Sequence, residues 1–225
     1  MFKRLKDFVT QLFAEKHPLM GGDVSKVTLD TIVPQSRLFN PDATVERGEA
    51  TVFGSDTDGI IDPTNTPYTW SNSLWDMMRG NEWGPEEVDV SGDIDAIREM
   101  SEDIQWSYER VLHALVANDS EQTRNIAMSV APFVSDGMVL SCLARQTYEE
   151  ANHSNSYDVM VKDVAIDRDR LYNLHKTDEF VRDRATYLEK MYAPLAYSKS
   201  EGVTMRMIMT ALIANNILEG IMFYA

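Results

Sequence analysis

Apolar residues recur at helical spacing along most of the chain after residue 67. Within 68–80, the large apolar side chains that would share one helix face are Trp70, Leu74, Trp75, Met77 and Met78. Longer segments with the same periodicity follow, separated by short stretches of turn residues. The pattern predicts helices at 68–80, 101–129, 135–163, 167–193 and 201–225.

The ends of these segments carry recognisable signals. Ser101, followed by acidic residues, is a typical helix start, and Pro132 and Pro194 are expected to end helices because proline lacks a backbone N–H. No stretch shows sustained strand-like alternation, and 21–67 is rich in turn residues. We therefore predict an all-α helical bundle over 68–225, preceded by an N-terminal part, 1–67, made of an amphipathic helix and an irregular arm.

Composition excludes several classes of protein. The chain has 225 residues, 44% of them apolar, which is enough for a proper core. Its formal net charge of −15 argues against direct binding of nucleic acid, which needs concentrated Lys and Arg. No apolar run is long enough to cross a membrane, and the N-terminal segment lacks the features of a signal peptide. With Cys142 as the only cysteine, we expect no disulfide and a reducing, cytoplasmic environment.

Ionisable residues occupy positions where a core is expected. Glu150, His153 and Tyr157 share one face of the helix 135–163, because offsets of three and seven bring side chains into line. Asp119 continues an apolar stripe on the helix 101–129, and Glu219 does the same on the last helix. Buried carboxylates are costly unless something neutralises them.

A di-metal site would neutralise these carboxylates. Ferritin-like di-metal bundles take one carboxylate from each of two helices and a Glu-x-x-His pair from each of two others. Three of these four elements are present, and the second Glu-x-x-His is missing. The remaining histidines cannot supply it, because none has a glutamate three positions earlier, so we expect them not to be ligands: His17, His113 and His175.

Four segments of the chain resemble motifs of one enzyme family, the small subunit of class I ribonucleotide reductase. They are "WGPEEVDVSGD" from Trp83, "LVANDSEQ" from Leu115, "EANHSNSY" from Glu150 and "NILEGIMFYA" from Asn216. The similarity spans Tyr68 to Ala225 with the motifs in the family's order. It implies a ferritin-like bundle that generates and stores a tyrosyl radical beside a di-metal centre.

The resemblance also implies roles for individual residues. Asp119 and His153 would bind the metal nearer the radical, Glu150 would bridge the two metals, and Glu219 would bind the second. The centre would be di-iron, di-manganese or mixed manganese and iron, and O2 would activate it.

Three aromatic residues match the family's redox residues. Tyr157 would carry the radical, Trp83 would relay it toward the large catalytic subunit, and Phe223 would line the radical pocket. The activity implied is the reduction of ribonucleoside diphosphates to deoxyribonucleotides, with the small subunit forming a dimer.

The sequence departs from the family in its C-terminal part. The family's second Glu-x-x-His and its docking tail have no counterpart here, and the last segment is still apolar at Met222 and Phe223. We therefore expect an incomplete bundle that lacks its C-terminal helices and is inactive alone. Either a separate C-terminal fragment completes a split subunit, or the sequence is a truncated piece.

Two other functions fit part of the pattern. Another ferritin-like di-iron oxidase would share the ligands but would need neither Trp83 nor Tyr157. A metal-poor interaction or regulatory protein derived from the reductase subunit would tolerate the missing ligands. Spectra of the purified chain with Fe(II) and O2, with and without a candidate C-terminal partner, would distinguish these two functions from that of a reductase subunit.

Overall fold

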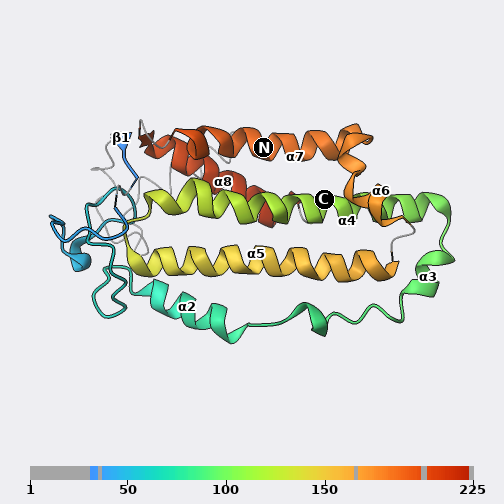
Figure 1. Cartoon of the computed structure of the whole chain (residues 1–225), viewed down its shortest axis with the longest axis horizontal. Coiled ribbons are helices and arrows are strands. Elements are labelled where there is room, and N and C mark those ends of the chain that lie inside the picture. Colours follow the sequence, from blue (N-terminus) through green and yellow to red (C-terminus); the bar gives the residue numbers. More distant parts are fainter. Residues whose placement is uncertain (1–30, 35–36, 165–166, 199–201, 223–225) are drawn as a thin grey trace, which may run out of the picture.

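Long helices packed side by side form the body of the protein. This computed structural model describes residues 31–34, 37–164, 167–198 and 202–222. The long helices are α4 (Glu102–Asn125), α5 (Gly137–Val164), α7 (Glu179–Tyr197) and α8 (Met205–Gly220). Figure 1 shows α4, α5 and α7 lying along the long axis, with α8 beside α7. The prediction of an all-α bundle with an irregular N-terminal arm is confirmed.

The connection between α4 and α5 turns the chain back on itself. A π-helical segment, η5 (Ile126–Val130), extends α4, and a 3₁₀ turn, η6 (Ala131–Phe133), follows it. Pro132 lies in that turn, as expected for a residue that cannot donate to a continuing helix. The carboxylate of Asp136 then accepts hydrogen bonds from the backbone of Met138 and Val139 at the start of α5. As a result, α4 and α5 run antiparallel (Figure 1).

Smaller elements cover one side of α5. Helix α2 (Trp70–Gly80) packs on it, confirming the predicted helix within a residue or two. An extended connection with a 3₁₀ turn, η4 (Pro85–Glu87), leads to the short helix α3 (Ile94–Arg98) (Figure 1). The sequence pattern did not predict α3.

The single helix predicted at 167–193 is wrong. The chain there forms α6 (Arg168–Tyr172), the 3₁₀ turn η7 (Leu174–Lys176) and then α7. Two aspartates start the new helices, because the side chain of Asp167 accepts a hydrogen bond from the Arg170 N–H and Asp178 accepts one from Val181.

Pro194 was also misread as a helix end. It lies inside α7, which continues to Tyr197. A proline in the last turn removes one backbone hydrogen bond, and the fully buried side chain of Leu195 holds that turn against the core. Packing outweighs the local preference at this position.

The last predicted helix is shorter at both ends in the described part of the chain. The two-residue strand β2 (Val203–Thr204) precedes α8 and pairs antiparallel with β1 (Thr31–Ile32). Thr204 then caps α8 by accepting a hydrogen bond from the Met207 N–H. The expected amphipathic N-terminal helix and the last residues of the chain lie outside the described residues, and the division at 67/68 stays a prediction.

The main hydrophobic core lies where α7, α8 and the η5–η6 turn meet. Its most deeply buried side chains are Phe133, Leu188, Leu195, Val203, Ile208 and Leu218. A second cluster joins α4, α5 and α6 through Leu112, Val161 and Leu171. Among the described residues, no helix is long and apolar enough to cross a membrane.

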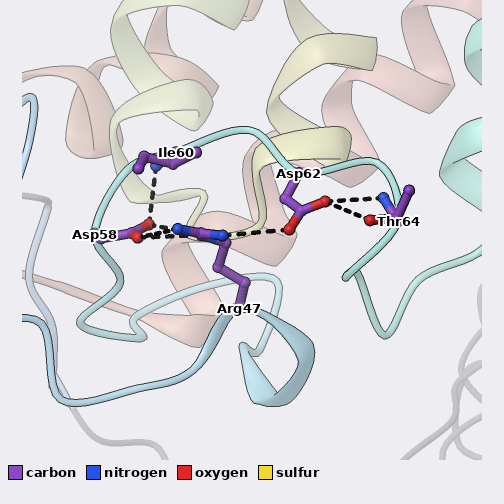
Figure 2. A network of polar contacts seen from close by, with 5 residues as sticks. All are labelled: Arg47, Asp58, Ile60, Asp62 and Thr64. Atoms are coloured by element: carbon purple, nitrogen blue, oxygen red, sulfur yellow. Dashed lines mark hydrogen bonds and ion pairs between the residues drawn. The ribbon is translucent and has the colours of Figure 1, made fainter.

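The irregular arm is held by polar side chains. Arg47 binds Asp58 through Nη2 at 2.6 Å and Asp62 through Nη1 at 3.2 Å (Figure 2). The hydrogen bonds from Arg47 hold the pKa of Asp58 below its usual range. Ser135 ties the arm to the bundle, because its hydroxyl accepts a hydrogen bond from the Ser55 N–H at 2.8 Å.

Loss of the Arg47 network should loosen the arm without unfolding the bundle. We expect Arg47→Met to speed limited proteolysis between residues 40 and 67, because Asp58 and Asp62 lose a shared cation, while the helical circular dichroism stays unchanged. Arg37→Met is the matched control, since the hydrogen bonds that Arg37 makes to Asn40 and Asp42 are exposed to solvent. Equal cleavage rates in both variants would contradict a holding role for Arg47.

Candidate metal centre

Asp119 is a carboxylate in the middle of the bundle that receives no hydrogen bond from the described residues. Its side chain is fully buried on α4, on the same helical stripe as Tyr108 and Leu112. Neither carboxylate oxygen accepts a hydrogen bond from a described protein group. A buried, unpartnered carboxylate is costly, so the position calls for a proton or a cation.

Helix α5 presents two more ligand-type side chains to Asp119. Glu150 and His153 lie one turn apart, and the Nδ1 atom of His153 is 3.6 Å from both Asp119 Oδ2 and Glu150 Oε2. The three side chains each offer a ligand atom within 4.8 Å of the others. With ligand bonds of about 2.0–2.2 Å, two ligands of one ion lie about 3–4 Å apart. The arrangement therefore fits a single metal ion.

Electrostatics point to a missing positive charge. Burial, followed by the negative charge of Glu150, raises the pKa of Asp119 to about 7. The pKa of His153 is also raised, chiefly by its interaction with Glu150. Glu150 Oε2, like the oxygens of Asp119, has no hydrogen-bond partner. Two carboxylates and one imidazole form a donor set that suits manganese or iron.

Glu219 approaches this cluster from α8. It is half-buried, and its Oε1 accepts a hydrogen bond from Gln122 Nε2 at 3.2 Å. Burial and the charge of Glu150 raise its pKa, so the two carboxylates influence one another across the bundle. Glu219 is not one of the three residues whose ligand atoms converge. Its assignment to a second ion stays a prediction.

Tyr157 lies one turn beyond His153 on α5. It packs against the cluster of Leu112, Val161 and Leu171. Burial, and then the charge of Asp119, raise the pKa of its phenol above the ordinary value. The phenol is therefore kept protonated in an apolar surround next to a candidate ligand.

Trp83 stacks on one of the three candidate ligands, His153. Its ring lies 5.8 Å from the ring of His153, measured between centroids, with 27° between the planes. Its backbone carbonyl accepts a hydrogen bond from Asn152 Nδ2 at 3.0 Å, which fixes the loop to α5. Phe223, expected in the radical pocket, lies outside the described residues.

The other histidines of the described chain lie away from the converging ligand atoms. His113 is buried on α4, where its Nδ1 pairs with the carbonyl of Leu171 at 2.7 Å. Its ring stacks on that of His175. Neither residue belongs to the ligand group.

Sequence reasoning missed the amides around the ligands. Gln122 contacts Glu219, and Gln146 Nε2 lies 3.5 Å from Glu150 Oε1. The sequence spacing could have indicated both glutamines, because Gln122 follows Asp119 by three positions and Gln146 precedes Glu150 by four. At those spacings side chains share a helix face.

The raised pKa of Asp119 predicts a pH dependence of stability. The folded chain holds this proton more tightly than the unfolded chain, whose value is near 3.8, so the free energy of unfolding should fall as pH rises from about 4 to about 7. Asp119→Asn should flatten that slope and stabilise the metal-free chain at pH 8 by about 1 kcal/mol or more, because one pKa unit corresponds to about 1.4 kcal/mol.

Urea unfolding of the metal-free chain at several pH values measures this effect. Asp42→Asn serves as the control, since the Asp42 side chain is 83% exposed. An Asp119→Asn chain with the wild-type slope would contradict the buried-charge account.

Comparison with known proteins agrees with this geometry. The family model "Ribonucleotide reductase, small chain" matches residues 61–225. The ribonucleoside-diphosphate reductase subunit beta of Treponema pallidum (strain Nichols) is 29% identical over 87% of this chain and 55% of its own length. The chain spans about half the length of the curated relatives it matches, at 55% and 52%.

Solved structures share the fold. The ribonucleotide reductase R2 subunit from Clostridium botulinum superposes with a TM-score of 0.78 at 24% identity, covering 87% of this chain and 60% of that one. The dimanganese(II)-NrdF of Streptococcus sanguinis gives a TM-score of 0.62 at 17% identity, covering 73% and 55%. These structures place the bundle in the ferritin-like fold of R2 proteins. On the extent of the family match, the chain belongs to the small-chain family of ribonucleotide reductases.

Proposed function

We propose that this chain supplies the radical-bearing half of a ribonucleoside-diphosphate reductase small subunit. The observation that carries the proposal is the convergence of the ligand atoms of Asp119, Glu150 and His153 within 4.8 Å. Three of the carboxylate oxygens receive no hydrogen bond from the described residues. Membership of the small-chain family supports it. Such a subunit would act in the cytoplasm and form a dimer.

The residues present fit one ion of a di-metal cofactor and part of the site for the other. Asp119 and His153 would hold one ion, Glu150 would bridge, and Glu219 would serve the other. The donor set allows iron, manganese or a mixed pair, and one solved structure of this fold is described as a dimanganese(II) protein. When bound and activated by O2, such a centre supplies one-electron oxidising power.

Tyr157 would be the residue that is oxidised. It would lose one electron to the activated centre and its phenolic proton to a base, for which Asp119 is the candidate because its carboxylate has the largest charge effect on the phenol. The surrounding Leu112, Val161 and Leu171 would exclude water from the resulting phenoxyl group. Exclusion of water and reductants is what a long-lived radical needs.

Trp83 would connect the centre with a partner protein. Its ring lies against the His153 ring and is itself only half-buried, so it spans from the ligand cluster toward the surface. This position supports a relay role toward the large catalytic subunit. The stacked Trp83 and the neighbouring Tyr157 favour the reductase over another ferritin-like oxidase, which needs neither.

A second polypeptide segment would complete the site. Glu150 and Glu219 give a second ion only two carboxylates among the described residues. Exposed apolar side chains lie on α8 at Ile213 (45%) and directly after it at Ile221 (60%). We propose that the missing ligands, including a second Glu-x-x-His, come from a segment equivalent to the C-terminal half of the relatives. It would be either a continuation of this polypeptide or a separate chain.

The chain of 225 residues should not hold a complete centre by itself. We expect it to retain fewer than two ions per chain through gel filtration after loading with Mn(II) or Fe(II), and to self-associate through its exposed apolar face. Size-exclusion chromatography with elemental analysis measures both properties. A monodisperse monomer that carries two ions per chain would show that no completing segment is required.

The assignment of the radical to Tyr157 depends on its phenolic hydroxyl. With Fe(II), O2 and the completing segment present, Tyr157→Phe should keep metal binding but lose the phenoxyl signal in electron paramagnetic resonance, because only the oxidisable hydroxyl is removed. Tyr172→Phe is the matched control, since the Tyr172 hydroxyl instead bonds Asp158 at 2.8 Å. A tyrosyl signal that survives in Tyr157→Phe would place the radical elsewhere.

Metal ligation can be tested with the same samples. Loss of a residue that only hydrogen-bonds a ligand lowers metal affinity roughly 10–100-fold. Asp119→Ala or His153→Ala would remove a ligand itself and should lower metal affinity by more than that. Unchanged metal content in both variants would overturn the ligand assignment and favour a metal-free regulatory role.

A further inference from the structure

Gln122 is a fully buried amide that joins α4 to α8. Its Nε2 donates hydrogen bonds to Glu219 Oε1 at 3.2 Å and to Asn215 Oδ1, and its Oε1 accepts one from Asn125 Nδ2 at 3.4 Å. The orientation of the amide is fixed, because flipping it would place its oxygen against two acceptors. Among the described residues, two side-chain hydrogen bonds join α4 to α8, and Gln122 donates both of them.

Helix α8 needs such a contact to define its rotation. Its sequence, MRMIMTALIANNILEG, is apolar on nearly every face, so hydrophobic packing alone selects no single rotation about the helix axis. Asn215 and Glu219 lie one turn apart on the same face. A buried polar contact in an apolar interface specifies register and orientation in this situation.

The contact also bears on where Glu219 points. Helix α8 packs mainly on α7, while the converging ligands Asp119, Glu150 and His153 belong to α4 and α5. Gln122 lies on α4 one turn beyond Asp119, so it ties Glu219 to the helix that carries the first ligand. Hydrogen bonds from a neighbouring side chain to a ligating carboxylate commonly fix its orientation.

We propose that Gln122 is a positioning residue that sets the rotation of α8 and orients the Glu219 carboxylate toward the Asp119, Glu150 and His153 cluster. The inference rests on the proposed metal centre. Its consequence is specific, because the ion that uses Glu219 should depend on Gln122, whereas the ion held by Asp119 and His153 should not.

Equilibrium titration with Mn(II) tests this on the full chain, because electron paramagnetic resonance counts free Mn(II) and detects weak sites as well as tight ones. Gln122→Met keeps the length of the side chain and removes its hydrogen bonds. We expect it to weaken the second, weaker Mn(II) site by about 10–100-fold, with little change at the first site. The spin coupling between neighbouring bound Mn(II) ions should weaken in parallel.

Two controls separate positioning from simple loss of stability. Gln105→Met removes a glutamine on the same helix that bonds the backbone carbonyls of 97, 98 and 100, so it should lower stability without changing the second site. Asn215→Ala leaves the bond from Gln122 to Glu219 in place and should weaken the second site less than Gln122→Met does.

Several results would overturn the proposal. If Gln122→Met keeps the wild-type circular dichroism and both Mn(II) affinities, Gln122 does not position Glu219. If that variant fails to fold, Gln122→Asn retains a buried amide that is one methylene too short, and an unchanged second site there overturns the role equally. A wild-type chain that binds no Mn(II), or binds it equally after Asp119→Asn, contradicts the metal centre and with it the role of Gln122.

Discussion

The burial of negative charge between α4 and α5 is the constraint on which the rest of the site depends. Asp119 is completely buried and Glu150 nearly so, and three of their oxygens receive no hydrogen bond from the part of the chain that the structure describes. Such charge is tolerated in a helical core only if a proton or a cation neutralises it. The raised pKa of Asp119 favours neutralisation by a proton, and the converging ligand atoms offer a place for a cation. Folding and the proposed metal binding would therefore be linked, because the same carboxylates oppose the first and would drive the second.

The two ends of the candidate centre are held with different rigidity. Asp119, Glu150 and His153 come from α4 and α5, which pack along their length and are joined by the short turn through η5 and η6. Glu219 comes from α8, whose main packing partner is α7. Its tie to α4 depends on one amide, that of Gln122. The position proposed for one ion is thus largely preformed, whereas the position proposed for the other would depend on how α8 is rotated and on what packs over it.

Helical periodicity allowed the ligand face to be predicted, because Glu150, His153 and Tyr157 fall on one stripe wherever α5 packs. The same logic placed Asp119 in the core. Periodicity failed where local capping decided the structure, as at Asp178, which starts a new helix inside an apolar pattern that otherwise continues. It also failed at Pro194, where the buried Leu195 outweighs a local preference. The pairing of Gln122 with Glu219 depends on how two distant helices meet, which no local pattern contains.

The placement of Trp83 shows why the rest of the site could not be predicted without knowing how distant segments pack together. The loop that carries Trp83 has no periodicity, and its position is fixed by a hydrogen bond from Asn152 on α5. That bond brings the indole ring onto His153, whose side chain is 39% exposed and is the most open of the three converging ligands. Tyr157 is partly buried as well, and it packs against the buried side chains of Leu112 and Val161. If the proposed centre forms, Trp83 would link it with the surface, and the apolar neighbours of Tyr157 would limit the access of water to an oxidised phenol.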